Sequence, residues 1–157
     1  MVQMALRCLV CVVSVFAVSA ASACILPANA SDLVQLLQVY INQERARHRL
    51  PGFHLNAALT RAAQAHACDN ANHNRLSHFG TDGSRPSTRV IRAGYDFRFV
   101  TENVAIGYAT PEQVLRAWLR SPTHRQNVLE SRTNELGLGV AVGRDGRLHW
   151  VMNGGLR

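Results

Sequence analysis

The 157-residue sequence contains no lysine, so arginine carries every positive charge outside the histidines and the amino terminus. The formal net charge of +7 reflects either a coding preference for arginine or a surface that attracts anionic partners. The arginines are scattered, and their densest group is Arg45, Arg47 and Arg49, which suits the negative end of a helix dipole. Because this scatter forms no dense basic stripe, we expect no nucleic-acid partner.

Long apolar runs are missing except near the start of the chain. Arg7 is followed by an apolar stretch from Cys8 to Val18, which is shorter than the roughly 20 residues that span a bilayer. Small residues then offer a cleavage site after Ala23. We therefore expect residues 1–23 to be a signal peptide and the protein to be secreted or periplasmic. The alternatives are an uncleaved anchor, or a lipoprotein anchored through Cys24.

Cysteine is scarce, with four in the whole sequence. Cys8 and Cys11 fall in the expected signal peptide, which leaves Cys24 and Cys68. Two cysteines in an oxidising compartment can form a disulfide, which would tie the tail of residues 24–30 to a helix. A buried thiol at Cys68 beside a free or lipidated Cys24 is the alternative.

Several catalytic signatures are also absent. The sequence has no G-x-S-x-G nucleophile motif and no H-E-x-x-H metal motif. The glycine pair Gly137 and Gly139 lies in a strand-like segment with no helix after it, so it does not form a phosphate loop. No internal repeat or low-complexity linker divides the chain. We expect one domain from residue 31 to residue 157.

Helix signals recur along this domain. Ser31 can cap a first helix, and Asn56 can cap a second, alanine-rich helix that packs closely against a neighbour. Ser84 can cap a short third helix that stops at Gly94. A capping box at Thr110 begins a fourth.

Extended segments dominate the second half. One extended segment runs from about 97 to 108, and two more fall at 136–142 and 148–152. The last two flank Asp145-Gly146, a strong hairpin signal. Helices on both faces of a small, mostly antiparallel sheet predict the α+β class, with a three-layer α/β/α sandwich.

Three side chains are the candidates for chemistry. His78 and His124 lie in turns rich in polar residues, and Glu102 lies among strand-forming residues, where an unpaired carboxylate would be costly to bury. Two imidazoles and one carboxylate form an acceptable set for Zn²⁺ or another divalent cation. We expect His66 to be structural. The other histidines, His48, His54, His73 and His149, are expected to be surface or packing residues.

Four segments of the domain resemble, in order and spacing, the motifs of the CAP superfamily (cysteine-rich secretory, antigen 5 and pathogenesis-related 1 proteins). The first segment is Ser77-His78-Phe79-Gly80 with Asp82-Gly83-Ser84, Arg89 and Ala93-Gly94-Tyr95. The others are Glu102-Asn103-Val104-Ala105, Trp118 with Ser121-Pro122-Thr123-His124-Arg125-Gln126-Asn127-Val128-Leu129, and Gly137-Leu138-Gly139. The resemblance covers about residues 33–153 and is closest to the bacterial branch. It implies the α/β/α sandwich and a cleft lined by His78, Glu102, Ser121 and His124.

The sequence departs from the family pattern at three places. Thr123 stands where the family usually has a glycine before the histidine. Ser121 stands where eukaryotic members have a second cleft glutamate, and a second aromatic is missing after Trp150. The resemblance implies a monomeric binding module for a lipid, a glycan or an extracellular protein, with His78 and His124 as candidate metal ligands. The alternative is a metal-dependent, peptidase-like hydrolase that uses the same histidines and Glu102 as its base. Whether the protein is an enzyme stays open at this point, although the lost glutamate favours binding.

Overall fold

The computed structural model describes residues 24–157, and the expected signal peptide, 1–23, lies outside the described residues. The described part contains five helices and four strands. In chain order they are α1 (Ala30–Arg47), β1 (His54–Leu55), α2 (Ala57–Asn72), α3 (Pro86–Arg92), β2 (Phe99–Ile106), α4 (Pro111–Arg120), α5 (Pro122–Val128), β3 (Glu135–Val142) and β4 (Leu148–Leu156). No helix in this part of the chain is long and apolar enough to span a membrane.

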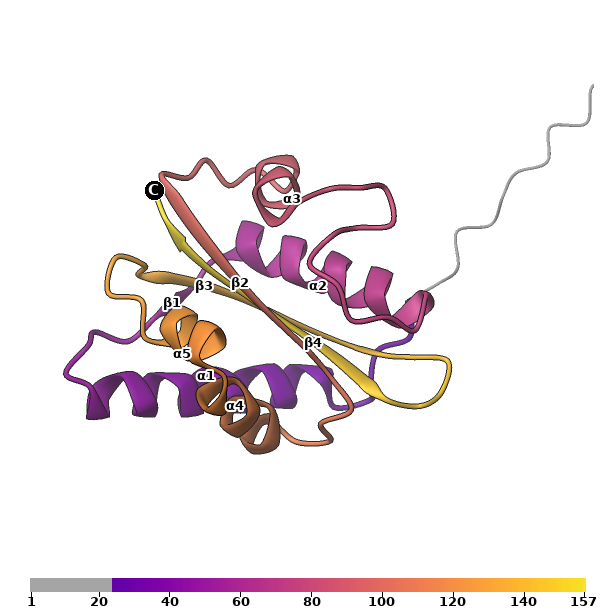
Figure 1. Ribbon diagram of the computed structural model, residues 1–157, viewed down its shortest axis with the longest axis horizontal. Helices are drawn as coiled ribbons and strands as arrows, with labels where there is room; N and C mark the ends of the chain where they lie inside the picture. Colours follow the sequence, from indigo (N-terminus) through magenta and orange to yellow (C-terminus); the bar gives the residue numbers. More distant parts are fainter. Residues whose placement is uncertain (1–23) are drawn as a thin grey trace, which may run out of the picture.

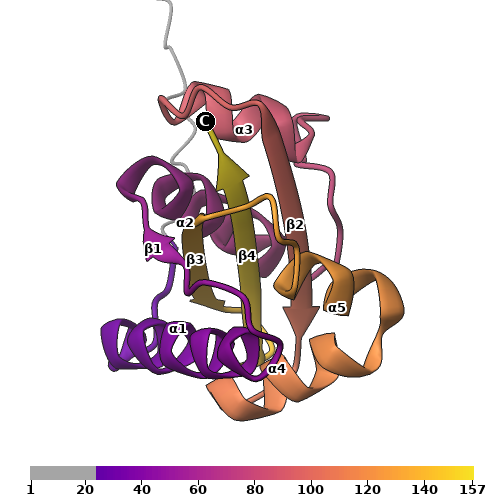
Figure 2. The ribbon, with the colours of Figure 1, turned by 90° about the vertical axis from the view of Figure 1, so that its left-hand side faces the viewer.

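The strands form one sheet in the order β1-β3-β4-β2. The two long pairings, β3 with β4 and β4 with β2, are antiparallel, whereas the two-residue β1 pairs with β3 in parallel. Figure 2 shows this order, with β2 at one edge of the sheet and α5 beside it. Sequence patterning missed β1, because two residues are too few to show an alternating pattern.

Helices cover both faces of the sheet. In Figure 1, α2 and α3 lie on one side of the strands, and α1, α4 and α5 lie on the other. The larger apolar core lies between the sheet and α1 with α4, around Leu37, Trp118 and Trp150. This arrangement confirms the predicted α+β class and the three-layer sandwich.

Two glycines of β3 allow α2 to lie directly on the sheet. A Cβ atom added at Gly137 would lie 2.1 Å from the backbone carbonyl carbon of Leu59, and one at Gly139 would lie 2.6 Å from that of Ala63. The small side chains of Ala63 and Ala67 line the same interface. The prediction that the alanine-rich helix packs closely is therefore confirmed.

The predicted helix caps were partly right. Asn56 accepts hydrogen bonds from the backbone N–H groups of Ala58 and Leu59, and Thr110 accepts one from Gln113. The predictions that Ser31 and Ser84 are N-caps were wrong, because α1 already begins at Ala30 and α3 begins only at Pro86. Pro86 at the first helical position has its φ angle preset for a helix, and α3 has no side-chain cap.

Arg45 differs most from its sequence interpretation. The sequence grouped it with Arg47 and Arg49 as charges that suit the negative end of the helix dipole, but its side chain is fully buried. Its guanidinium lies 3.7 Å from the centroid of the Phe53 ring. It donates hydrogen bonds to four backbone carbonyls. These belong to Pro51, Val128, Glu130 and Thr133. Arg45 therefore ties the loops at residues 49–53 and 129–134 to α1.

The predicted disulfide is present between Cys24 and Cys68, so the alternative of two unpaired cysteines is wrong for this structure. It joins the N-terminal tail to α2. The tail is also bonded to the sheet, since the backbone N–H of Val142 donates to the carbonyl of Ile25.

Tyr95 supplies an aromatic ring near the chain end, where the family's second aromatic residue is missing. Tyr95, which follows α3, packs on Gly155, where an added Cβ would lie 2.5 Å from its hydroxyl. The hydroxyl donates to Glu135 at 2.6 Å. The final strand is thus covered by a residue outside it.

Candidate functional site

Glu102 occupies the middle of the edge strand β2, opposite Asn153 of β4. Successive residues of a strand point to opposite faces, so Glu102 points to the α2–α3 side, while Asn103 points to the α4–α5 side. Only 2% of the Glu102 side chain is exposed. A carboxylate buried to this degree requires partners for both oxygens.

Both oxygens of Glu102 have a cationic or polar partner. The Nδ1 atom of His78 lies 2.9 Å from Oε1, and the Nη2 atom of Arg89 donates to Oε2 at 2.6 Å. The loop between α2 and α3 brings His78 to the sheet edge, and α3 brings Arg89. Because Arg89 also donates from Nη1 to the Ser84 carbonyl, α3, the loop and β2 are linked at this point.

His78 is the exposed member of this group, with 48% of its side chain accessible to solvent. Since the carboxylate can only accept, the Nδ1 atom of His78 donates to it, and Nε2 is then the unprotonated atom of the neutral ring. This geometry fixes the tautomer of an imidazole that solvent can reach. The prediction that His78 and Glu102 come together is consistent with this contact.

Arg89 is the site residue that sequence reasoning missed. It belonged to the matching family pattern, but nothing in its local spacing indicated that it pairs with Glu102. The only available signal was the requirement that a buried carboxylate meet a cation, which does not say which of 17 arginines supplies it.

His66 lies behind the carboxylate. Its Nε2 atom is 2.7 Å from the carbonyl oxygen of Ser77 and 3.9 Å from Oε1 of Glu102. Burial lowers the pKa of this fully buried imidazole, although the nearby carboxylate opposes the shift. The sequence-based expectation that His66 is structural is confirmed by these contacts.

The two family motifs on β2 and α5 bond directly to each other. Asn103 donates to the backbone carbonyl of His124 at 2.9 Å. Asn127 donates to the Glu102 carbonyl at 3.0 Å and to the Asn103 side chain at 2.8 Å. Trp118 donates to the carbonyl of Val104. The Glu102 and Val104 carbonyls on the outer edge of β2 thus have hydrogen-bond partners, whereas an open edge could pair with another strand.

The hydrogen bond from Asn103 to its backbone carbonyl holds His124 in place, and the residue is half-buried. Burial lowers the pKa of its imidazole, and the charge of His78 lowers it further. His124 therefore lies within electrostatic reach of His78, although it does not contact Glu102. Ser121 lies at the junction of α4 and α5, where its backbone carbonyl accepts the Arg125 N–H and its hydroxyl makes no capping bond.

The arrangement does not suit Glu102 as a metal ligand. Among residues 24–157, no three or more histidine, cysteine, aspartate or glutamate side chains are grouped so that they could hold a metal ion. The guanidinium of Arg89 lies against one carboxylate oxygen and would repel a cation. A divalent cation at this site would have to be bound by His78 and His124, and no reaction step is assigned to one.

Comparison with known proteins gives the same picture for most of the chain. Residues 39–153 match the model of the cysteine-rich secretory protein family. The chain is 27% identical over 113 residues to the Bacillus subtilis protein YkwD, in an alignment that covers 72% of this chain but 44% of YkwD. The alignment with the B. subtilis membrane protein YlbC covers 29% of that protein, at 28% identity. The chain thus spans less than half the length of either relative.

Two solved structures share the fold. An extracellular protein with an SCP domain from Bacillus anthracis is 25% identical, with a TM-score of 0.74, over 82% of this chain and 41% of that one. An outer surface protein from Borrelia burgdorferi has a TM-score of 0.73 at 23% identity, over 80% of this chain and 93% of that one, and shows the fold alone. The motifs, the sandwich and these matches together identify the chain as a member of the cysteine-rich secretory protein (CAP) family.

Proposed function

We propose that this chain is an exported CAP domain that acts as a binding module, with His78 and His124 as its recognition side chains. The observation that carries the proposal is the occupation of both Glu102 oxygens by His78 and Arg89. A carboxylate used in this way orients an imidazole and is not free to activate water. The site then offers an exposed histidine, His78, whose ring is oriented by Glu102, while Arg89 holds Glu102 in place.

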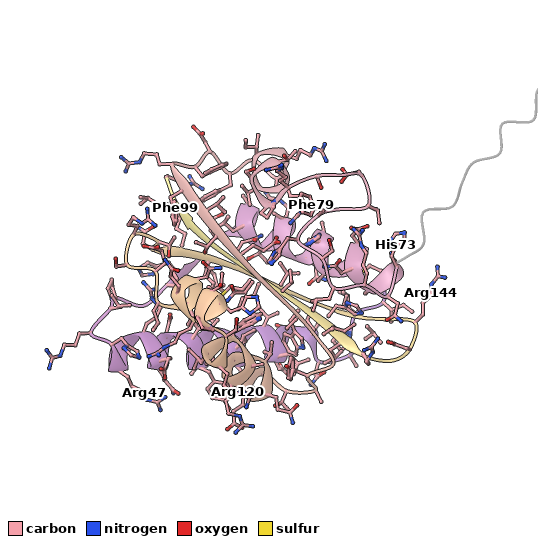
Figure 3. The ribbon with its side chains drawn as sticks, in the orientation of Figure 1. Arg47, His73, Phe79, Phe99, Arg120 and Arg144 are labelled. Atoms are coloured by element: carbon pink, nitrogen blue, oxygen red, sulfur yellow. A yellow bond between two sulfur atoms is a disulfide. The ribbon has the colours of Figure 1, made fainter. Side chains whose placement is uncertain are left out.

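The ligand is a lipid, a glycan or an extracellular protein that contacts this edge of the sheet. Phe79, the residue after His78, is 54% exposed and gives the same loop an apolar contact. Figure 3 shows Phe79 on the α2–α3 side of the molecule. An imidazole next to an exposed aromatic ring suits a ligand that has both polar and apolar surface.

Native mass spectrometry of protein recovered from its own host tests the binding role. We expect a retained small molecule, or a cross-linked protein, that is lost in the double variant His78→Ala/His124→Ala. His54→Ala, an exposed histidine on β1, is the matched control and should keep the ligand. Ligand-free spectra together with no cross-linked partner in the wild type would contradict the proposal.

Binding of Zn²⁺ or another divalent cation by His78 and His124 is a separate prediction. Calorimetric titration with Zn²⁺ should give a saturable heat for the wild type and for His54→Ala. Each of His78→Ala and His124→Ala should remove it, because two ligands are the minimum of such a site. Equal heats in all four proteins would rule out the metal site.

The hydrolase alternative has one observation in its favour. A carboxylate bonded to Nδ1 of an exposed histidine is the arrangement that prepares Nε2 to accept a proton. If His78 acts in this way, turnover of peptides or esters should disappear in His78→Gln, while the folded state is retained. Absence of turnover on a broad substrate panel would leave the binding role.

Export is supported by the disulfide and by the relatives. A structural disulfide is typical of oxidising compartments outside the cytosol. The B. anthracis protein is described as extracellular and the B. burgdorferi protein as an outer surface protein. Lipidation at Cys24 would need the sulfur atom that is bonded to Cys68, so a lipoprotein form could not have this disulfide. Mass measurement of the exported protein, with and without reduction, distinguishes the two forms.

A further inference from the structure

A hollow lies between α2, α3 and the loop that joins them, on the face that carries the Glu102 carboxylate. Its volume is about 610 Å³, within the range of about 300–1,000 Å³ that is typical of small-molecule sites. His78 and His124 are not among its lining residues. It adjoins the recognition site proposed above, because Arg89 and His66, which lie against the Glu102 carboxylate, are in its lining, but it does not include the two recognition histidines.

One wall of the hollow is lined by small apolar side chains. Ala62 and Ala65 of α2 and Ala93 at the end of α3 form it, and Gly80 from the loop adds no side chain. An added Cβ at Gly80 would lie 2.4 Å from the Ser84 hydroxyl, so the Ser84 and Asp82 side chains would have to rotate to make room for it. The wall can receive the apolar side of a small ligand.

The acidic residues of the lining are already bonded within the protein. Asp69 accepts from the backbone N–H and the hydroxyl of Thr81 and from Arg75. Asp82 accepts from the Ser84 backbone N–H and from Arg92. Asp69 therefore has little capacity left to accept hydrogen bonds from a ligand, whereas the half-exposed Asp82 can still accept from a ligand hydroxyl group.

The arginines at the rim retain unused donors. Arg61 donates from Nη2 to the carbonyl of Ala93, and Arg92 donates from Nη1 to Asp82. In the part of the chain that the structure describes, these are the only hydrogen bonds of the two guanidinium groups, each of which has five N–H donors. A surplus of cationic donors over free acceptors favours an anionic ligand group, and a carboxylate fits the guanidinium fork.

The inner lining contains two buried polar atoms that have no hydrogen-bond partner among the described residues: Nδ1 of His66 and Nε of Arg89. Since Nε2 of His66 donates to the Ser77 carbonyl, Nδ1 of the neutral ring is an acceptor, whereas Nε of Arg89 is a donor. Unpaired buried polar atoms are rare and often indicate a missing ligand or water. A hydroxyl group can satisfy either atom, because it both donates and accepts.

We propose that this hollow binds a small carboxylate with a hydroxylated body, which is the chemistry of an acidic sugar. The carboxylate pairs with Arg61 and Arg92 at the rim, the hydroxyl groups face His66 and Arg89, and the apolar face of the ring lies on the alanines. The inference does not depend on the proposed function of His78 and His124.

Nuclear magnetic resonance titration of the exported, disulfide-bonded protein with glucuronate tests this site. We expect saturable shifts in α2 around residues 61–69 and in residues 80–93. Glucose, which lacks the carboxylate, and acetate, which lacks the hydroxyl groups, should each bind about tenfold or more weakly. Equal affinity for either compound, shifts centred on His78 and His124, or no saturable shift would overturn the proposal.

Variants test the named residues. Arg61→Gln and Arg92→Gln should each weaken glucuronate binding about tenfold or more. Ala65→Phe, on the exposed side of α2, should block the hollow without removing a polar group. Arg120→Gln is the matched control, because Figure 3 places Arg120 on α4, on the other side of the sheet. The proposal fails if Arg120→Gln weakens binding as much as Arg61→Gln, or if Ala65→Phe binds like the wild type.

Discussion

Arg89 and Glu102 form a buried ion pair between α3 and the edge strand β2, with 2.6 Å between Nη2 and Oε2. The side chains are 9% and 2% exposed, so neither charge is solvated by bulk water. This pair links the covering helix to the strand that carries the candidate site. Its integrity should therefore affect both stability and the orientation of His78.

Breaking this pair should destabilise the protein strongly. Arg89→Met leaves the Glu102 carboxylate with a single partner, and losing one member of a buried pair costs about 3–5 kcal/mol of unfolding free energy. Urea denaturation followed by circular dichroism measures the loss. Arg116→Met is the control, because its pair with Glu112 is exposed and should contribute at most about 1 kcal/mol. Similar losses in the two variants would contradict the role of burial.

Replacing Arg45 should be about as damaging, although no carboxylate contacts it. Arg45→Met removes a donor from four backbone carbonyls, of which that of Glu130 keeps the Thr133 hydroxyl, and each buried group left unsatisfied costs about 1–3 kcal/mol. We expect a large fall in the thermal unfolding midpoint or failure to fold. Arg45→Lys should recover only part of the stability, because an ammonium group cannot reproduce the planar fork. Arg47→Met, at an exposed neighbour, should stay within about 0.5 kcal/mol of wild type.

Gly137→Ala should separate α2 from the sheet. The added Cβ would lie 2.1 Å from a backbone carbon of Leu59, and a backbone atom cannot rotate away as a side chain can. We expect a loss of roughly 1–3 kcal/mol or more, as in other overpacked cores, measured by urea denaturation. Ala141→Gly, in the same strand, tests whether any change at this interface has this effect. An unchanged midpoint for Gly137→Ala would show that the helix can shift at little cost.

Removal of the disulfide should lower stability without changing the fold. The bond closes a loop with a sequence separation of 44 residues, and disulfides of this kind contribute about 2–4 kcal/mol. Cys24→Ser/Cys68→Ser should match the reduced wild-type protein in its denaturation midpoint. A reducing agent should have no effect on the double variant. A wild-type midpoint that is insensitive to reduction would contradict this prediction.

Acidification should destabilise the protein in the range where histidine titrates. Burial is the largest cause that lowers the pKa of His66, His124 and His149 in the folded state. Because the unfolded chain then binds more protons, stability is complete above the unfolded pKa of about 6.5 and falls as the pH decreases below it. Denaturation midpoints measured between about pH 7 and pH 5 should therefore decrease.

A variant isolates the contribution of one buried ring. His149→Gln should reduce the slope of stability against pH, whereas His73→Gln, at an exposed position, should leave it unchanged. Equal slopes in the wild type and His149→Gln would assign the pH dependence to other groups.

Local sequence features determined the layers of this fold and much of their order. The caps at Asn56 and Thr110 and the hairpin at Asp145-Gly146 act over a few residues, so their physical effect can be inferred without coordinates. The alanines of the second helix likewise predicted close packing against a neighbour. The disulfide followed from the small number of cysteines and from the compartment.

Only the tertiary structure decided which charges meet. Arg45 and Arg89 look like the other arginines in the sequence, yet both are buried and bonded to groups far along the chain. The pairing of Glu102 with Arg89, the bonds between Asn103 and α5, and the hollow beside α2 depend on distances set by the packing of several elements. Hydrophobic periodicity and helix caps act locally, whereas the pairing of buried charges is fixed only when the layers come together.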